Sequence, residues 1–313
     1  MDKSVLKANS KKAIDTIDSK NKEYDLETAN ALWVMEGYSL NEQYLSNVEE
    51  YYNGTIEQLD FTNEPEMSVN TINGWVEEKT NQRIKNTISR DLIDQNTQLI
   101  ITNTVYFNGL WEHEFDADYI RNRTFHLSNG DSKKVSTMDN THKFGYAENQ
   151  DAKILELPYK GDNLCMYLVL PLNNNIAEFE NNFTLSDYNE LKRSMNSEEM
   201  VVVRVPKFTF ETKTELKKPL MEMGLVDAFD LGSANFSGIN KDEELAISKI
   251  IHQTFIDVHE KGTEAAAATS VEMEDEALLS TWEFEADHPF LFFIEEKQTG
   301  CILFMGKVED PQY

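Results

Sequence analysis

The amino-acid sequence predicts an α+β fold in one domain. Segments whose apolar residues recur at helical spacing concentrate near the amino terminus, and runs rich in β-branched and aromatic residues fill much of the remaining chain. These runs do not alternate regularly with helical segments, which disfavours a doubly wound parallel sheet. No repeat, linker or low-complexity stretch divides the 313 residues, and a chain of this length can bury a large core.

The helical pattern occurs in early segments, which we predict to be surface helices. These segments are residues 3–19, 41–52 and 68–80. Strands are predicted where β-branched and aromatic residues cluster, and there are too many of them for one sheet. The predicted strands are residues 29–35, 98–107, 154–157, 164–170, 200–205, 208–211, 255–259, 290–295 and 301–305.

The chain is strongly acidic. It contains 29 Lys and Arg against 56 Asp and Glu, a formal net charge of −27, so its surface repels phosphate backbones and anionic headgroups. The apolar runs are far shorter than the roughly 20 residues that span a bilayer. Residues 1–12 are basic and polar, unlike a signal peptide. We therefore expect a soluble chain with neither nucleic acid nor a membrane as a partner.

Residue types that carry catalysis or bind metals do not occur at the spacings those functions need. Cys165 and Cys301 are far apart, which indicates neither a disulfide framework nor a zinc site. His252 and His259 lie in a strand-like context, and no His-Glu-x-x-His pair occurs. Gly-x-Ser-x-Gly and Gly-x-Gly-x-x-Gly are absent, and the glycines of residues 300–307 are one residue too far apart for a phosphate-binding loop. We expect no metal, no cofactor and no enzymatic activity.

The segment at residues 260–276 combines two conflicting signals. One set of alternating positions is small or apolar and the other is charged or small, as in a strand with one buried face: Thr263, Ala265, Ala267, Thr269, Val271 and Met273 against Glu264, Ala266, Ala268, Ser270, Glu272 and Glu274. The run of alanines nevertheless favours a helix. Such a conflict is expected where a segment must be stable in two places, exposed in one state and paired in another. An ordinary alanine-rich surface helix or linker is the alternative interpretation.

Several segments of the chain, beginning with this one, resemble a known family. Glu260-Lys-Gly-Thr-Glu-Ala-Ala-Ala-Ala-Thr resembles the hinge of the inhibitory serpins, a superfamily of serine protease inhibitors whose reactive loop inserts into a sheet. Further segments resemble serpin segments in the family's order. They are Asn30-Ala-Leu-Trp-Val, Ile72-Asn-Gly-Trp-Val-Glu-Glu-Lys-Thr-Asn, Thr102-Asn-Thr-Val-Tyr-Phe-Asn-Gly-Leu-Trp, Leu155-Glu-Leu-Pro-Tyr, Val205-Pro-Lys-Phe, Asp287-His-Pro-Phe-Leu-Phe-Phe-Ile and Thr299-Gly-Cys-Ile-Leu-Phe-Met-Gly-Lys-Val.

The resemblance implies a serpin fold with three β-sheets, surrounding helices and an exposed loop, with the hinge and reactive loop at residues 260–286. It also implies inhibition of a serine-type endopeptidase. The target protease cleaves the loop and forms an acyl-enzyme, and insertion of the loop into the central sheet then distorts the protease before water releases it. About 12 inserted residues, at roughly 0.5–1.5 kcal/mol net per hydrogen bond, gain on the order of 10 kcal/mol. The uncleaved form is therefore expected to be metastable.

The resemblance also assigns roles to individual residues. Asn103 and His252 match a polar pair in the shutter region, where two strands must part, and Trp111 matches the breach, where the loop enters. Lys207 and Glu260 match an amine and a carboxylate that pair across the top of the sheet. Small hinge side chains would pass between strands without overpacking, and a glycine would give backbone freedom at the pivot. The hinge residues are Glu260, Gly262, Thr263, Glu264, Ala265, Ala266, Ala267, Ala268 and Thr269.

The family's usual spacing from hinge to scissile bond places that bond at Glu276–Ala277. The acidic residues around it predict a Glu- or Asp-directed target with a basic primary pocket, a serine protease or else a cysteine protease. Cleavage after Leu278 or Leu279, which suits a hydrophobic pocket, is the main alternative because the loop is slightly long for the family. We expect a monomer, and family habit suggests an extracellular location although the chain shows no export signal.

The chain departs from the family at its beginning. Serpins usually carry three helices and a strand before the point that matches residue 1, including a helix beneath the central sheet. Either the sequence is a fragment or it is a truncated homologue, and a non-inhibitory binding or structural protein is the alternative function. The chain as written is then expected to bind a hydrophobic dye and to unfold at low temperature.

Overall fold

The computed structural model describes residues 3–17, 24–241, 244–263 and 282–313. Contacts divide the chain into two compact units. The first unit comprises residues 1–20, 26–106 and 211–255, and the second comprises residues 21–25, 107–210 and 256–313. Of the helices in the described ranges, none is both long and apolar enough to cross a membrane.

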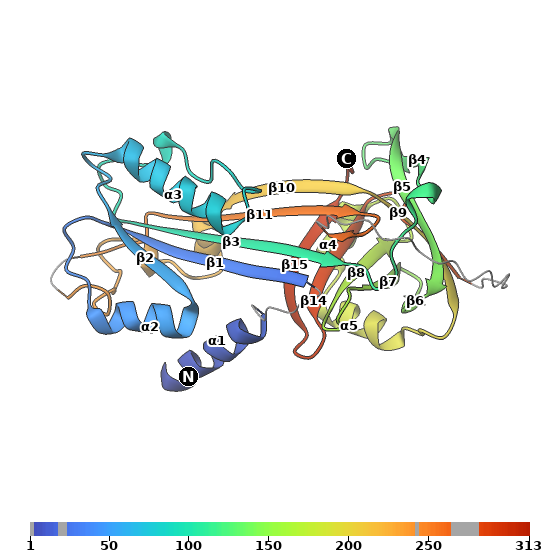
Figure 1. The fold of residues 1–313 in the computed structure, drawn as a ribbon, viewed down its shortest axis with the longest axis horizontal. Coiled ribbons are helices and arrows are strands. Elements are labelled where there is room, and N and C mark those ends of the chain that lie inside the picture. The colour runs from blue at the N-terminus through green and yellow to red at the C-terminus, as the bar shows by residue number, and fades with distance from the viewer. Residues whose placement is uncertain (1–2, 18–23, 242–243, 264–281) are drawn as a thin grey trace. The chain divides into compact units, whose positions relative to one another are not determined.

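A six-stranded sheet has the order β10-β11-β12-β3-β1-β2, and four of its strands have residues in both units. The strands are β1 (Tyr24–Met35), β2 (Gly54–Leu59), β3 (Leu99–Leu110), β10 (Phe208–Glu215), β11 (Lys249–His259) and β12 (Gly262–Thr263). Figure 1 shows β10, β11, β3 and β1 side by side. In the first unit, β3 and β11 pair directly in parallel over residues 100–105 and 249–254, two segments that we call the seam.

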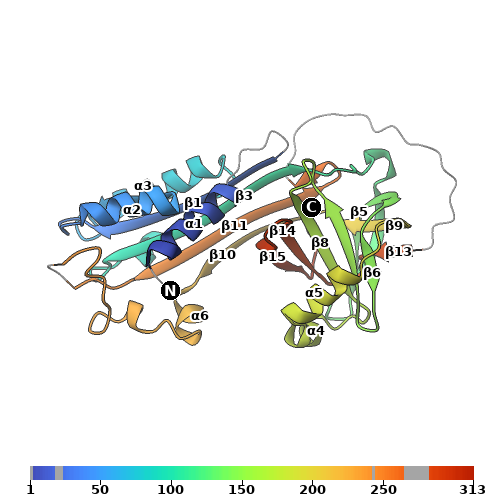
Figure 2. The ribbon, with the colours of Figure 1, turned by 90° about the horizontal axis from the view of Figure 1, so that it is seen from below.

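In the first unit, apolar residues cover both faces of the strands. The helices are α1 (Lys3–Ile17), α2 (Glu42–Tyr52), α3 (Pro65–Lys79) and α6 (Lys217–Glu222), with 3₁₀ turns at Arg90–Leu92 and Asp227–Phe229. Trp33 packs in one cluster with Ile72 of α3, whereas its neighbour Val34 packs in another with Ile247. Successive residues of a strand point to opposite faces, so β1 contributes to two cores. Figure 2 shows α3 and α6 on opposite sides of these strands.

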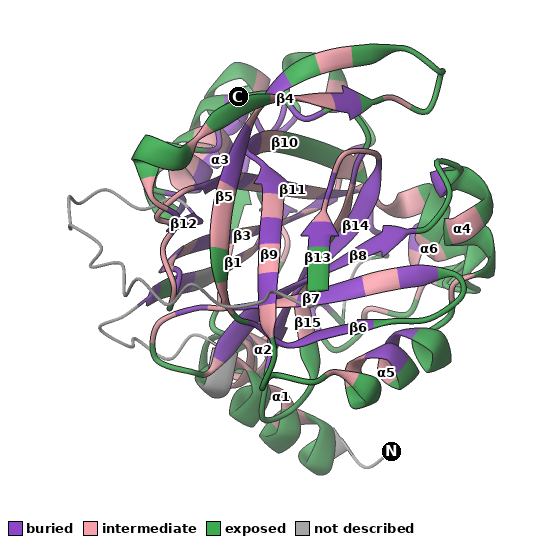
Figure 3. Ribbon diagram, turned by 90° about the vertical axis from the view of Figure 1, so that its right-hand side faces the viewer, coloured by how far each residue is buried: buried purple, intermediate pink, exposed green. Residues whose placement is uncertain are grey.

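The second unit contains two further sheets, with the orders β13-β9-β5-β4 and β15-β14-β8-β7-β6. The first has β4 (Arg121–His126), β5 (Ser132–Lys143), β9 (Met200–Pro206) and β13 (Trp282–Glu285), and the second has β6 (Tyr146–Glu148), β7 (Ala152–Pro158), β8 (Leu164–Pro171), β14 (Phe290–Glu296) and β15 (Cys301–Val308). Every residue of β8 is buried. The strand lies between β7 and β14 and packs under α4 (Ile176–Asn182) and α5 (Leu185–Ser194), whose outer faces are exposed (Figure 3).

The structure has the α+β composition and the three sheets expected from the sequence. Every predicted helix or strand overlaps an observed one. The sequence did not predict β2, β4, β5, β6, β13 or the short helices α4, α5 and α6. β4 and β5 are rich in polar and charged residues, and few of their positions are fully buried, so neither shows a clear apolar alternation.

Candidate functional site

In the second unit, the chain reverses direction after β11 and returns between the ends of β3 and β11. The hinge turn, our name for residues 259–263, comprises the last residue of β11, the two connecting residues and β12. Gly262 and Thr263 pair in antiparallel fashion with β11 on one side and with Leu110 and Gly109 of β3 on the other. Two residues of the chain therefore already lie between β11 and β3 at this end of the sheet.

Gly262 lies too close to β3 to carry a side chain. A β-carbon added there would come within 2.0 Å of the carbonyl oxygen of Gly109 and 2.8 Å of the α-carbon of Leu110. Any other residue would push β12 away from β3. The close approach of two backbones thus requires glycine at this hinge position.

Thr263 is buried, with 1% of its surface exposed, and its side chain meets Tyr159. The Thr263 Oγ1 lies 2.8 Å from the Tyr159 hydroxyl oxygen, and either group can donate. The Tyr159 ring stacks on Trp111 with centroids 4.5 Å apart and meets the Phe107 ring edge-on at 4.8 Å. Burial raises the pKa of Tyr159 well above its ordinary value, so the phenol stays protonated. The site accepts a small side chain that carries a hydroxyl group.

The segment after β3 donates hydrogen bonds to three successive carbonyl groups of the hinge turn. The Trp111 indole N–H donates to the carbonyl oxygen of His259 at 2.9 Å, and the Trp111 backbone N–H donates to that of Lys261 at 2.9 Å. The backbone N–H of Phe115 donates to the carbonyl oxygen of Glu260 at 2.8 Å. Trp111, which the family resemblance assigns to the breach, is thus in direct contact with the hinge turn.

Lys207 and Glu260 form an ion pair, with 2.9 Å between Nζ and Oε2. Both side chains are largely buried, and the Lys207 ammonium also lies 3.8 Å from the centre of the Tyr313 ring. Burial opposes ionisation of Glu260, but contact with Lys207 outweighs it and lowers the pKa of Glu260 below its ordinary value. The pair anchors the hinge turn to the residue that follows β9.

Breaking this ion pair is expected to destabilise the protein. Lys207→Met and Glu260→Gln each leave one partly buried group unmatched, so each should lower the free energy of unfolding by about 1–3 kcal/mol. The double variant should lose about 1 kcal/mol less than the two single losses added together, as measured by denaturant unfolding at pH 7. Since the pKa of Glu260 is lowered in the folded state, the advantage of the wild type over Glu260→Gln should fade as the pH drops below about 4.5. Strictly additive losses would contradict the coupling.

Asn103, His252 and Asn30 form a hydrogen-bonded row across β11, β3 and β1 in the first unit. The His252 Nδ1 lies 2.6 Å from the Asn103 Oδ1, and the Asn103 Nδ2 donates to the Asn30 Oδ1 at 2.6 Å. Because the Asn103 oxygen accepts, the neutral imidazole carries its proton on Nδ1. Burial lowers the pKa of His252, which favours the neutral ring. This row joins the two strands of the seam.

Asn103→Asp is expected to raise the pKa of His252. A carboxylate in hydrogen-bond contact stabilises the imidazolium form, so the pKa should rise by about 1–2 units. NMR titration of the His252 ring in the wild type and the variant measures the shift. Asn30→Asp is the matched control, because it places the same charge one residue further along the row and should have a smaller effect. An unchanged titration in Asn103→Asp would mean that the Asn103 side chain does not face the imidazole.

The remaining predicted site residues lie outside the described part of the chain. They are the hinge residues Glu264, Ala265, Ala266, Ala267, Ala268 and Thr269 and the reactive bond at Glu276 and Ala277. Sequence reasoning in turn did not assign Asn30, Gly109 or Tyr159 to the site. Each of the three lies in a segment that resembles the family, but its role depends on partners far away in the sequence.

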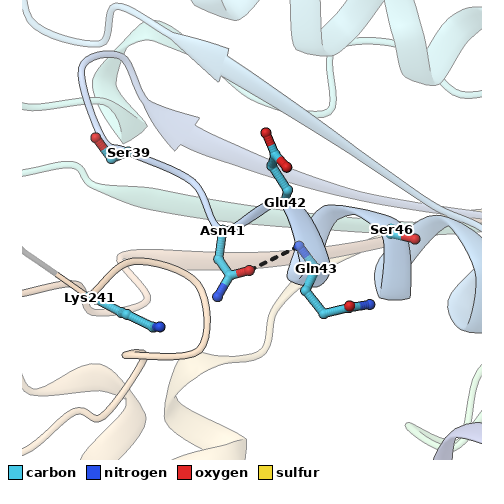
Figure 4. Close-up of a pocket in the computed structure, with 6 residues that line it drawn as sticks. All are labelled: Ser39, Asn41, Glu42, Gln43, Ser46 and Lys241. Carbon is cyan, nitrogen blue, oxygen red and sulfur yellow. Dashed lines mark hydrogen bonds between the residues drawn. The ribbon is translucent and has the colours of Figure 1, made fainter.

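A hollow at the amino end of α2 is separate from the hinge turn and the seam. It is lined by Ser39, Asn41, Glu42, Gln43, Ser46 and Lys241 (Figure 4). The Asn41 side chain caps α2 by accepting a hydrogen bond from the Gln43 backbone N–H at 2.9 Å, which satisfies a free donor of the helix. Within the described residues, no group of three or more His, Cys, Asp and Glu side chains could hold a metal ion.

Almost the whole chain matches one family. The family model described as serpin (serine protease inhibitor) matches residues 1–311. The chain belongs to the serpin family. An uncharacterized serpin-like protein of Methanosarcina acetivorans is 62% identical over 313 residues, which are 100% of this chain and 74% of that protein. Human Serpin B12 is 37% identical over 306 aligned positions, and the match covers 95% of this serpin and 76% of the human protein.

Solved structures share the fold of this serpin. The crystal structure of Serpin48, a highly specific serpin of the insect Tenebrio molitor, has a TM-score of 0.89 and 33% sequence identity. The match covers 100% of this chain and 82% of Serpin48. The serpin fold expected from the sequence is therefore confirmed.

Proposed function

We propose that this serpin inhibits a protease by acting as its suicide substrate. The protease cleaves the loop beyond Thr263, and the loop then enters the central sheet between β3 and β11 before the acyl-enzyme is hydrolysed. The proposal rests on the position of β12, which pairs with β11 on one side and with β3 on the other. Gly262 and Thr263 already lie between β3 and β11, whereas the seam of the same two strands is closed by direct pairing.

We take the register of the entering loop from the observed strand pairings. Thr263 lies opposite Gly109 of β3, and the seam pairs Asn103 with His252. If β12 continued in the same antiparallel register, residue 269 would come opposite both Asn103 and His252. The hydrogen bond between these two side chains would have to break first. We infer that this row is a point at which the closed sheet resists insertion.

For the cleaved bond we propose Glu276–Ala277, with a Glu- or Asp-directed serine protease as the target. This assignment rests on the hinge-to-bond spacing of the family and on the acidic residues Glu272, Glu274 and Asp275. A bond after Leu278 or Leu279 and a target with a hydrophobic pocket is the competing assignment. A cysteine protease would use the same trapping step, since it also forms an acyl-enzyme.

The test is incubation with a panel of purified proteases that covers both assignments. A complex that survives boiling in detergent is expected with at least one protease, together with a released carboxy-terminal fragment. Sequencing the new amino terminus of that fragment identifies the bond: Ala277 supports the proposed assignment, and Leu279 or Ser280 supports the competing one. Cleavage by every protease without any stable complex would contradict inhibition and would favour a non-inhibitory binding protein.

A further inference from the structure

Two histidines of the second unit stack on each other. The ring centroids of His113 and His142 are 3.5 Å apart, with 25° between the ring planes. Phe144 meets both rings edge-on, at 5.8 Å in each case. His142 lies on β5 and His113 lies in the segment that follows β3. This histidine pair therefore joins that segment to β5.

The same segment carries the backbone donors of the hinge turn. Trp111 and Phe115, two residues before and two residues after His113, donate to the carbonyl oxygens of Lys261 and Glu260. On the other side, the Asn140 side chain of β5 donates to the carbonyl oxygens of His113 and Glu114, at 3.3 and 3.1 Å. A displacement of His113 from β5 would therefore move the groups to which the hinge turn is bonded.

We propose that His113 and His142 are positioning residues that make the attachment of the hinge turn dependent on pH. The neutral His113 ring stacks on His142 and keeps residues 111–115 against β5. A charged His113 ring is disfavoured in this buried stack, so its protonation separates the rings and weakens the backbone hydrogen bonds from Trp111 and Phe115. Acidification then frees the hinge turn. If the serpin inhibits as proposed, a freed hinge turn should let the loop enter the sheet faster below neutral pH.

The environment of His113 favours its neutral, stacked state near pH 7. Burial, together with the neighbouring His142, lowers the pKa of His113 from 6.5 to about 4. A ring released to water regains an ordinary pKa near 6.5, so the separated state binds a proton more readily than the stacked state. The equilibrium therefore shifts toward separation as the pH falls from about 6.5 to about 4.

The elements packed against the pair carry charged groups, but the one neighbouring ionisable group that acts on the pKa of His113 is His142. Glu114 pairs with Lys160 at 2.7 Å, and Lys143 lies 3.9 Å from Glu198. Strand β9 places the uncharged Val201 opposite His142. The segment of His113 contributes Glu112 and Glu114, and β5 contributes Lys143. Lys160 follows β7, Glu198 precedes β9 and Lys207 follows β9. The hinge turn contributes His259, Glu260 and Lys261.

Hydrogen–deuterium exchange of the Trp111 and Phe115 amides tests the proposal on the intact chain. After correction for the intrinsic exchange rate, protection should fall roughly tenfold between pH 7 and pH 5 in the wild type. His113→Phe keeps an aromatic ring on His142 but removes the titrating group, so its protection should persist at pH 5. His126→Gln, on β4, is the matched control and should retain the wild-type dependence.

Two results would overturn the proposal: a flat profile in the wild type, or an unchanged pH dependence in His113→Phe. Burial also lowers the pKa of His252 and of His259. Both histidines are still present in His113→Phe. The difference in pH dependence of amide protection between the wild type and this variant therefore reports on the histidine pair alone. Complex formation with a protease is measured separately. If amide protection at Trp111 and Phe115 depends on pH but no protease is trapped, the proposed function is refuted and this inference is still supported.

Discussion

If this serpin inhibits a protease as we propose, Thr263→Arg is expected to convert it from an inhibitor into a substrate. Thr263 is 1% exposed and its hydroxyl meets that of Tyr159, so an arginine could stay between β3 and β11 only by burying an unpaired charge. A barrier raised by about 2.7 kcal/mol slows insertion about a hundredfold. The acyl-enzyme would then be hydrolysed before the loop enters. Gel electrophoresis in detergent should show cleaved serpin in place of the stable complex.

Two further substitutions separate size from hydrogen bonding at this position. Thr263→Ser keeps the hydroxyl group that contacts Tyr159 and should inhibit almost as well as the wild type. Thr263→Val keeps the volume but leaves the buried Tyr159 phenol without this partner, at a cost of about 1–3 kcal/mol. Its inhibition should therefore be intermediate. Complex formation by Thr263→Arg at the wild-type rate would refute the role of a small residue here.

The fold could be predicted from the sequence where burial leaves a clear pattern. β8, from Leu164 to Pro171, is buried throughout and reads as one apolar run, and α3 shows apolar residues at helical spacing because one of its faces packs on β1. β5 escaped prediction because polar residues line much of it, as in Asp139 and Asn140. Its place in the sheet comes from pairing with β4 and β9, which no local pattern reveals.

The site residues that belong to one contiguous motif could be predicted from the sequence. Gly262 and Thr263 stand in a contiguous motif, but the reasons for them lie elsewhere: the Gly109 carbonyl is in β3, and Tyr159 is 104 residues away from Thr263. The stacking of His113 on His142 likewise depends on where β5 meets the segment after β3. Neither histidine belongs to a metal-binding or catalytic spacing, so the sequence offered no reason to pair them.

Cleavage of the loop is expected to raise the free energy of unfolding by on the order of 10 kcal/mol, because an inserted strand makes new backbone hydrogen bonds with both β3 and β11. For a chain of this size, such a gain raises the unfolding midpoint by roughly 20 °C. Calorimetry of the intact and the cleaved protein under identical conditions measures the change. Cleaved Thr263→Arg should gain much less, since its hinge does not pass between the strands.

A disulfide across the seam would locate the insertion. Asn103 and His252 face each other through a 2.6 Å hydrogen bond, so cysteines at both positions are close enough to be oxidised to a disulfide. Cys301 is exposed and should be replaced by serine, whereas Cys165 is buried. The locked seam cannot part, so cleavage should leave the unfolding midpoint of the oxidised variant unchanged, and reduction should restore the gain. A full gain with the disulfide intact would mean that the cleaved loop stabilises the protein without entering between β3 and β11.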